Sequence, residues 1–254
     1  MAKKGEIKLL GTRGSNFVNR VQIALNLKCV DYEFIDQNLD TKSDLLLKSN
    51  PVHKKVPVLL YGNEPPVVES LIILEYIDEI FPDVHPILPC DPSHRATIAL
   101  GPTLLIQRYY YNCNNLSRYL NFDQFLQFIP LFDDLRLAAN KEEKDEVIVK
   151  IRETAKMLEQ VFVEYCSDGK AYFGGDDIGY LDIALGCFLG WVTFHQTLNN
   201  FKVFDDTITP SLVEWAKTIR VHEAISKSTP DKRCTSKTLC VGSTCETIQN
   251  SLKL

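Results

Sequence analysis

The spacing of apolar residues changes once along the chain, and this change restricts the fold more than any other feature. The first eighty residues alternate between strand-like runs and helix-like spacing, beginning with an apolar run at residues 7–10 that Gly11 ends. Val18, Val21 and Leu25 then recur at the spacing of one helical face. The chain is therefore predicted to open with a strand followed by a helix.

Three further strands and a second helix complete this first region. Strands are expected at residues 32–35, 56–61 and 67–68, the last two joined by a hairpin through Gly62 and Asn63. Residues 70–81 repeat apolar side chains on one helical face. This order predicts an α/β domain, a mixed sheet flanked by helices, over residues 1–82.

Prolines recur between residues 82 and 92, so residues 83–91 are predicted to form a linker. Beyond it only helical spacing is found, and an all-helical bundle is expected over residues 92–230. A polar tail follows at residues 231–254. The expected helices of the bundle are residues 93–120, 122–139, 141–166, 180–197 and 211–226.

Composition excludes several classes of partner. Hydrophobic residues make up 45% of the 254 residues and charged residues 24%, as in ordinary globular domains. The net charge of -5 gives no basic surface for nucleic acid or for an anionic membrane, so neither is an expected partner. No stretch has the length and apolarity of a signal peptide or a membrane span, and a cytosolic location is predicted.

The eight cysteines are scattered without a C-x-x-C pair, and Cys187 lies within an apolar run. Reduced thiols of a cytosolic protein are the expected state. Cys234, Cys240 and Cys245 lie close together in the tail, but their spacing lacks nearby histidine and is a poor zinc pattern. No metal is therefore expected.

Ser15 lies where the first strand passes into the first helix, beside unpaired helix N–H groups and the positive end of the helix dipole. One interpretation is that Ser15 or Asn16 only caps the helix. The other is that its hydroxyl donates a hydrogen bond to a bound thiolate. A thiol of pKa about 8.5 is mostly protonated at neutral pH, and lowering this pKa by two units requires about 2.7 kcal/mol.

Val56 and Pro57 stand at the start of a predicted strand, where proline is normally disfavoured. A cis peptide bond would leave the N–H and C=O of Val56 facing an extended peptide ligand, whereas an ordinary trans proline at a strand end is the alternative. Ser70 is predicted to cap the next helix, beside Glu69.

Charged side chains of both signs surround these positions. With Lys42 and Lys55, Glu69 would suit a zwitterionic peptide that carries two carboxylates and one amine. The alternative for each of them is a solvated surface charge.

Three segments resemble the tau class of plant glutathione transferases: SNFVNRVQIALNLK, KSDLLLKSNPVHKKVPVLLYGNEPPVVESLIILEYIDEIFPD and YFGGDDIGYLDIAL. They cover nearly all of the first predicted domain and the last third of the second. The resemblance implies a thioredoxin-like N-terminal domain that binds glutathione and an all-helical domain that accepts an apolar second substrate. It also implies a homodimer.

The resemblance assigns roles to residues of the first domain. Ser15 takes the position of the serine that activates the glutathione sulfur. Lys42 and Lys55 match lysines around the glycyl end of glutathione, and Val56 matches the backbone partner of the cysteinyl unit beside a cis proline. Glu69 and its neighbour form the γ-glutamyl site.

Two further assignments follow from the same resemblance. Ser70 is the second member of the γ-glutamyl site. Asp182 falls on an aspartate that caps a helix and supports folding in the family.

The sequence departs from the tau pattern around the second-substrate site. Asn16 replaces the usual proline, and Arg13 replaces a residue that is commonly apolar or aromatic and faces the second-substrate pocket. Gly101 and Pro102 are expected to kink the first long helix of the second domain. The candidate pocket residues are Arg13, Phe17, Arg108, Tyr109, Tyr110 and Tyr111, although an aromatic stripe is also typical of a helix core.

Three functions are compatible with these residues. The leading hypothesis is an enzyme that joins the glutathione thiolate to a small apolar electrophile, with Ser15 stabilising the thiolate. A non-catalytic carrier of a plant metabolite is the second, and a glutathione-dependent isomerase or addition-elimination enzyme is the third. Thiol exchange by a catalytic cysteine is not expected, because Cys29 is the cysteine nearest the first helix and lies beyond its far end.

Overall fold

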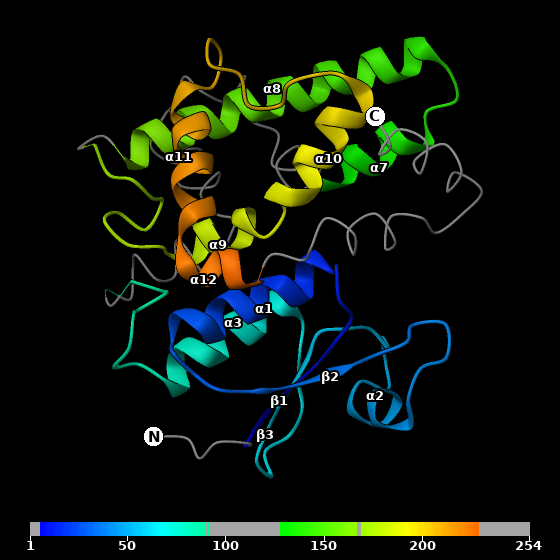
Figure 1. Cartoon of the computed structure of the whole chain (residues 1–254), viewed down its shortest axis with the longest axis vertical. Helices are drawn as coiled ribbons and strands as arrows, with labels where there is room; N and C mark the ends of the chain where they lie inside the picture. The colour runs from blue at the N-terminus through cyan, green and yellow to red at the C-terminus, as the bar shows by residue number, and fades with distance from the viewer. Residues whose placement is uncertain (1–5, 90, 92–127, 167–168, 229–254) are drawn as a thin grey trace, which may run out of the picture. The chain divides into compact units, whose positions relative to one another are not determined.

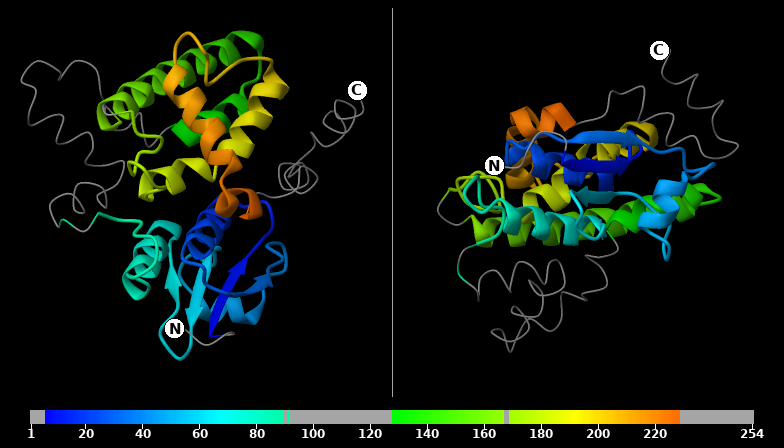
Figure 2. Two further views of the ribbon diagram at one scale, coloured as in Figure 1. Left: turned by 60° about the vertical axis from the view of Figure 1, so that its left-hand side comes forward. Right: turned by 90° about the horizontal axis from the view of Figure 1, so that it is seen from below.

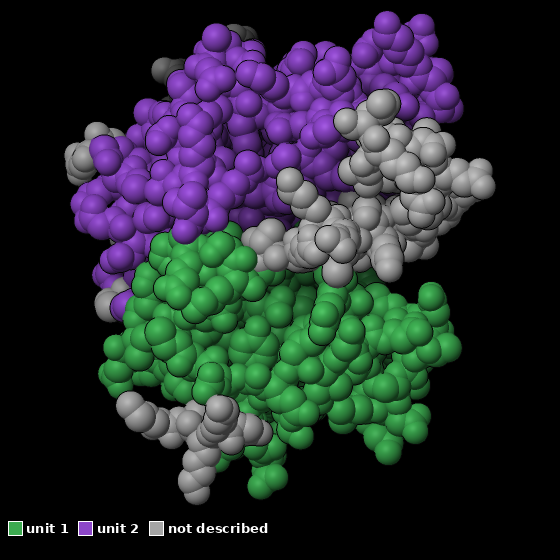
Figure 3. Space-filling view, in the orientation of Figure 1, with its two compact units in different colours: residues 1–85, 222–254 green, residues 86–221 purple. Residues whose placement is uncertain are grey.

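The computed structural model describes residues 6–89, 91, 128–166 and 169–228. The chain divides into two compact units (Figure 3), one formed by Met1–His85 with His222–Leu254 and the other by Pro86–Val221. The first unit contains the sheet, and the described part of the second is built from helices (Figure 1). The predicted pairing of an α/β region with an all-helical region is confirmed.

A four-stranded mixed sheet forms the centre of the first unit, in the order β2-β1-β3-β4. β1 pairs parallel with β2 and antiparallel with β3, and β3 pairs antiparallel with β4. The third strand was predicted at residues 56–61, which is too long, because β3 starts only after Pro57. The strands are β1 (Ile7–Gly11), β2 (Glu33–Asp36), β3 (Val58–Tyr61) and β4 (Val67–Val68).

Helices cover both faces of this sheet. Leu46 of α2 (Asp44–Ser49) packs with Leu10 and Val58 on one face. Because side chains alternate along a strand, the side chain of Leu9 points to the opposite face. The sequence analysis missed α2, which has a single buried residue and therefore no apolar period.

The opposite face is covered by α1 (Asn16–Leu27) and α3 (Ser70–Ile80), which pack against each other. Gly11 allows this close approach. A Cβ atom on Gly11 would lie 2.6 Å from a methyl group of Val18, nearer than real Cβ atoms come to other atoms. The glycine that ends β1 therefore fixes how closely α1 sits on the sheet.

The predicted helix at residues 211–226 is two helices. α11 (Pro210–Val221) ends before His222, and α12 (Glu223–Ser228) then packs on α1 (Figure 2). Asn26 of α1 donates hydrogen bonds to the carbonyl of Ala224 at 3.2 Å and to the hydroxyl of Ser228 at 2.7 Å. Residues from both ends of the described chain thus build the first unit.

The second unit contains α7 (Phe128–Leu137), the long α8 (Lys141–Tyr165), α9 (Tyr180–Gly186), α10 (Leu189–Asn199) and α11. One predicted helix is wrong here, since residues 180–197 form α9 and α10 with a break at Cys187 and Phe188. The expected helix at residues 93–120 and the start of that at 122–139 lie outside the described residues.

Asp182 is the buried polar centre of the second unit, with no exposed surface. Its carboxylate accepts hydrogen bonds from the backbone N–H groups of Phe173, Gly174 and Gly179, each at 2.9 Å, and from Nε1 of Trp215 at 2.7 Å. Burial raises the pKa of Asp182, and these four donors oppose that shift. The predicted role at the start of a helix is confirmed, because the carboxylate caps α9.

His195 is a second buried polar group in this unit, with 2% of its surface exposed. Its ring contacts the rings of Phe132, Trp191 and Phe194, and neither ring nitrogen has a hydrogen-bond partner among the described residues. Burial, with a smaller contribution from the charge of Arg136, lowers the pKa of His195 to about 4. The imidazole is therefore neutral at physiological pH.

The cysteines within the described ranges form no disulfide: Cys166 and Cys187 are buried and Cys29 is exposed. Cys234, Cys240 and Cys245 lie outside the described residues. Within the described ranges, no helix combines the length and apolarity needed to cross a membrane. The same ranges hold no group of three or more metal-ligating side chains.

Candidate functional site

Ser15 is the N-cap of α1. Its backbone is extended, and its Oγ accepts a hydrogen bond from the N–H of Val18 at 3.4 Å. The predicted capping role is therefore present. Accepting this long bond uses a lone pair and not the hydroxyl hydrogen, which can still be donated to a second group. Capping and donation to a ligand are thus compatible in the same hydroxyl.

The register of the sheet brings several predicted site residues to one edge. Gly11 at the end of β1 is level with Asp36 at the end of β2. On the other side of β1, Leu10 is level with Val58, which is level with Val68. The chain segments that leave the sheet at this edge are those that carry Ser15, Lys42, Val56 and Glu69.

The Val56–Pro57 peptide bond is cis, as the position of the proline suggested. Val56 is half-buried and precedes β3. Among the described residues, no backbone hydrogen bond uses its N–H or C=O. These two groups are therefore available to an extended peptide.

Lys55 is exposed and lies at the end of a loop that Asn50 holds in place. The Asn50 side chain, buried from solvent, donates to the carbonyl of Lys55 at 3.0 Å and accepts from the N–H of His53 at 3.2 Å. Lys42 is exposed on a second loop, directly before Ser43, the N-cap of α2. Neither lysine forms an ion pair with a described residue, so both cations can bind an anion.

Glu69, and not Ser70, is the N-cap of α3, which corrects the prediction from sequence. Glu69 has a φ of 67°, unfavourable for a residue with a side chain, and is exposed. Such backbone strain costs about 1–3 kcal/mol and concentrates at functional sites. Ser70 is the first residue of the helix, and its Oγ accepts a hydrogen bond from Nη1 of Arg20 at 2.8 Å.

Two predicted second-substrate residues lie near the start of α1. Arg13 is exposed, and its Nε lies 3.9 Å from a carboxylate oxygen of Asp36. Phe17 is 48% exposed, and its ring lies 5.5 Å from the guanidinium carbon of Arg20. An ion pair as exposed as this one contributes little to stability, about 0–1 kcal/mol.

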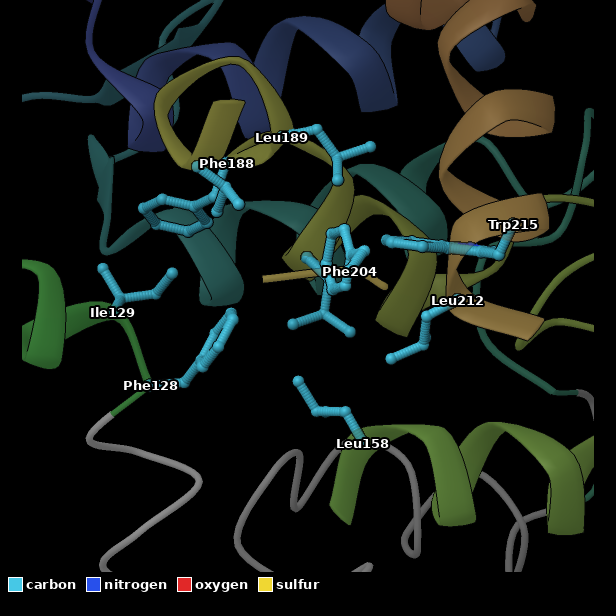
Figure 4. A pocket seen from close by; sticks show the side chains of 10 residues that line it. Phe128, Ile129, Leu158, Phe188, Leu189, Phe204, Leu212 and Trp215 are labelled. Carbon is cyan, nitrogen blue, oxygen red and sulfur yellow. The ribbon is translucent and has the colours of Figure 1, made fainter. Parts of the chain in front are cut away.

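The other predicted pocket residues, Arg108, Tyr109, Tyr110 and Tyr111, lie outside the described residues, as do Gly101 and Pro102. An apolar cavity is present in the second unit (Figure 4), and neither Arg13 nor Phe17 is among the described residues that line it. Its lining side chains are Phe128, Ile129, Leu158, Leu185, Phe188, Leu189, Val192, Phe204, Leu212 and Trp215.

Three buried polar residues support the site and were not found from the sequence: Arg20, Gln37 and Asn50. Each contacts a loop or helix start that carries a predicted ligand-binding residue. Their side chains bond across the fold or within loops, and polar residues in such positions resemble surface residues when only the sequence is read. The sequence held one signal of this burial, for Arg20 alone: its position in α1 among apolar residues that are themselves buried.

Comparison with known proteins identifies the family. Residues 5–79 match the model "Glutathione S-transferase, N-terminal domain", and residues 118–223 match "Glutathione S-transferase, C-terminal domain". The chain belongs to the glutathione S-transferase family. Glutathione S-transferase U17 of Arabidopsis thaliana is 42% identical over 227 residues, covering 89% of this chain and 91% of that protein.

The class follows from the solved structures. The tau-class glutathione S-transferase of mango, Mangifera indica, is 36% identical with a TM-score of 0.77, covering 93% of this chain and 99% of that one. A rice enzyme, GST1, solved in complex with glutathione, is 26% identical with a TM-score of 0.70, covering 99% and 100%. This chain is a glutathione transferase of the tau class, as the three sequence segments indicated.

Proposed function

We propose that this enzyme transfers the glutathione thiolate to a small, apolar electrophile and that Ser15 stabilises the thiolate. The observation that carries the proposal is the strand register, which brings the segments bearing Ser15, Val56 and Glu69 to one edge of the sheet. The complex of the rice relative with glutathione supports glutathione as the co-substrate.

Each part of glutathione has a chemically suitable partner at this edge. The N–H and C=O of Val56 pair with the cysteinyl unit in the manner of an added strand. Lys42 and Lys55 neutralise the glycyl carboxylate. Glu69 binds the ammonium group, and the γ-glutamyl carboxylate binds at Ser70, where α3 begins.

The Ser15 hydroxyl accounts for the chemistry. It lies at the N-terminus of α1, where the unpaired N–H groups and the helix dipole favour an anion. A hydroxyl donor aimed at the sulfur stabilises the thiolate relative to the thiol. Together with the fixed position of the peptide, this lowers the barrier to attack on an electrophile held nearby.

The remaining features belong to the same proposal. The second substrate is apolar and small, and the enzyme works as a homodimer in the cytosol without a metal. The glutathione-binding domain spans residues 1–82, and residues 83–91 link it to the second-substrate domain at residues 92–230. Residues 231–254 form a tail. Arg13, Phe17, Arg108, Tyr109 and Tyr110 are the proposed second-substrate residues.

A carrier function is the second candidate, because the described side chains that line the cavity of the second unit are all apolar, as is usual in sites for apolar ligands. Binding of an apolar dye that is unaffected by loss of Ser15, with no conjugation of several electrophiles, would favour the carrier. Conjugation that depends on Ser15 would exclude it as the main function.

The decisive experiment compares Ser15→Ala with the unchanged protein. Calorimetric titration measures glutathione affinity, and conjugation of a generic aromatic electrophile measures turnover. We expect affinity to stay within about threefold and turnover to fall by about a hundredfold, the effect of removing one donor from a developing anion. Ser226→Ala removes an exposed hydroxyl in α12 and serves as the control. Equal turnover by both variants would refute the role of Ser15.

A further inference from the structure

Gln37 is a buried amide that follows β2 directly, and only 5% of its surface is exposed. Its backbone N–H donates to the carbonyl of Gly11 at 2.7 Å, at the end of the strand that leads to Ser15. Its side-chain Nε2 donates to the carbonyls of Ile35 and Asp36, each at 3.3 Å. These contacts fix which way the side-chain amide faces, with the nitrogen toward the two carbonyls and Oε1 away from them.

Oε1 of Gln37 accepts a short hydrogen bond of 2.6 Å from the hydroxyl of Ser43. The same hydroxyl accepts from the N–H of Leu46 at 3.2 Å and so caps α2. Ser43 is the residue immediately after Lys42. The loop that carries Lys42 is therefore attached at its far end to a buried side chain of the sheet region.

The geometry points to Gln37 as a positioning residue for glutathione, acting through Ser43 on Lys42. One residue bonds to the end of β1, which leads to Ser15, and to the start of α2, which follows Lys42. It thus sets the spacing between the thiolate end and the glycyl end of the site. The inference rests on the proposed function, since it takes Lys42 as a ligand of the glycyl carboxylate.

Only an amide at position 37 can both accept the hydrogen bond of Ser43 and donate to the carbonyls of Ile35 and Asp36. A carboxylate at position 37 would still accept from Ser43 but would face the carbonyls of Ile35 and Asp36 without a proton to donate. An apolar side chain would leave the Ser43 hydroxyl and both carbonyls without their partner. Either change releases the loop and lets Lys42 sample positions that do not bind the peptide.

The test measures glutathione affinity by calorimetry, kcat at saturating glutathione and the free energy of unfolding for Gln37→Met. Methionine keeps the size and length of the side chain and removes its hydrogen bonds. We expect the glutathione Kd to rise about tenfold while kcat stays within about twofold, because the residue touches neither sulfur nor electrophile. Gln22→Met is the matched control, since Gln22 loses one hydrogen bond to Tyr32 in the same unit.

Variants of Ser43 separate the link from simple capping of α2. Ser43→Asp still caps the helix but presents an acceptor to Oε1 of Gln37, so the Kd is expected to rise as in Gln37→Met. Ser43→Thr keeps the hydroxyl and is expected to keep the affinity. Equal affinity of the Asp and Thr variants would overturn the inference.

A double variant distinguishes this inference from the function on which it rests. Lys42→Ala alone is expected to weaken glutathione binding, and adding Gln37→Met should weaken it little further, because both act through one side chain. Additive losses would show that Gln37 does not act through Lys42.

An unchanged Kd in Lys42→Ala would show that Lys42 is not part of the glutathione site. That result would overturn the inference but would leave the test of Ser15 unaffected. A loss of stability in Gln37→Met with unchanged Kd would reduce Gln37 to a structural residue.

Discussion

Nη1 of Arg20 lies 2.8 Å from Oγ of Ser70, so the second turn of α1 supports the first residue of α3. Both side chains are buried. A buried guanidinium at this point places a positive charge beneath the proposed binding position of the γ-glutamyl carboxylate. The guanidinium carbon of Arg20 also lies 5.5 Å from the ring of Phe17, a proposed second-substrate residue. One side chain thereby contacts a residue of each of the two proposed substrate sites.

Replacing Arg20 by methionine should weaken glutathione binding about tenfold or more, because it removes the charge and the donor that hold the Ser70 hydroxyl. Calorimetric titration with glutathione measures the effect. Arg152→Met alters an exposed arginine of α8 and should leave the affinity unchanged. If both variants bind glutathione like the unchanged enzyme, Arg20 does not contribute to the site.

Asp182→Asn should lower the free energy of unfolding by about 3–5 kcal/mol, the usual cost of breaking a buried charged network. The new amide nitrogen would face backbone N–H groups that now donate to the carboxylate. Urea denaturation followed by fluorescence measures the change. Asp176→Asn removes a carboxylate whose ion pair with Lys170 is largely exposed, and a loss below about 1 kcal/mol is expected there. Similar losses in both variants would contradict the central role of Asp182.

His195 should make the stability of the enzyme depend on pH between about 6.5 and 4. Its pKa is lowered to about 4 in the folded protein from an ordinary value of 6.5. Within this window the unfolded chain binds more protons than the folded one, so stability rises with pH and falls as the solution is acidified. The full contribution is about 3 kcal/mol, lost by pH 4.

His195→Phe should flatten this part of the stability profile, since phenylalanine does not titrate and fits among aromatic neighbours. Thermal or urea unfolding at several pH values between 4 and 7 measures the slope. His53→Phe provides a matched change at an exposed histidine and should leave the slope as it is. An unchanged slope in His195→Phe would assign the pH dependence to other groups.

The sequence predicted the elements whose periodicity is strong or whose ends carry a clear signal. Gly11 marks the end of β1, and the buried apolar residues of α1 and α3 recur at regular helical spacing. The break between α9 and α10 was missed because Cys187 and Phe188 keep helical backbone angles, and neither residue type signals a helix end. A Cβ atom on Gly186, which precedes the break, would lie 2.8 Å from the terminal methyl group of Ile219, so the glycine permits this close packing.

The candidate site was predictable only in part. Ser15 and the Val56–Pro57 bond could be located because a serine at a helix start and a proline at a strand start are both visible in a linear sequence. Gln37 and Asn50 could not, since an amide in a loop is ordinarily a solvated turn residue. Their burial and their partners arise only when separate segments are brought together by the fold.

The packing of α12 on α1 has a consequence for synthesis on the ribosome. The sheet unit uses residues from the beginning of the chain and from positions 223–228, so its last helix is translated after the whole helical unit. The partly made sheet unit emerges with one side of α1 uncovered, including the half-buried amide of Asn26. A nascent chain of this enzyme therefore completes its first folding unit last, and a chaperone that shields α1 during elongation would act on it for most of translation.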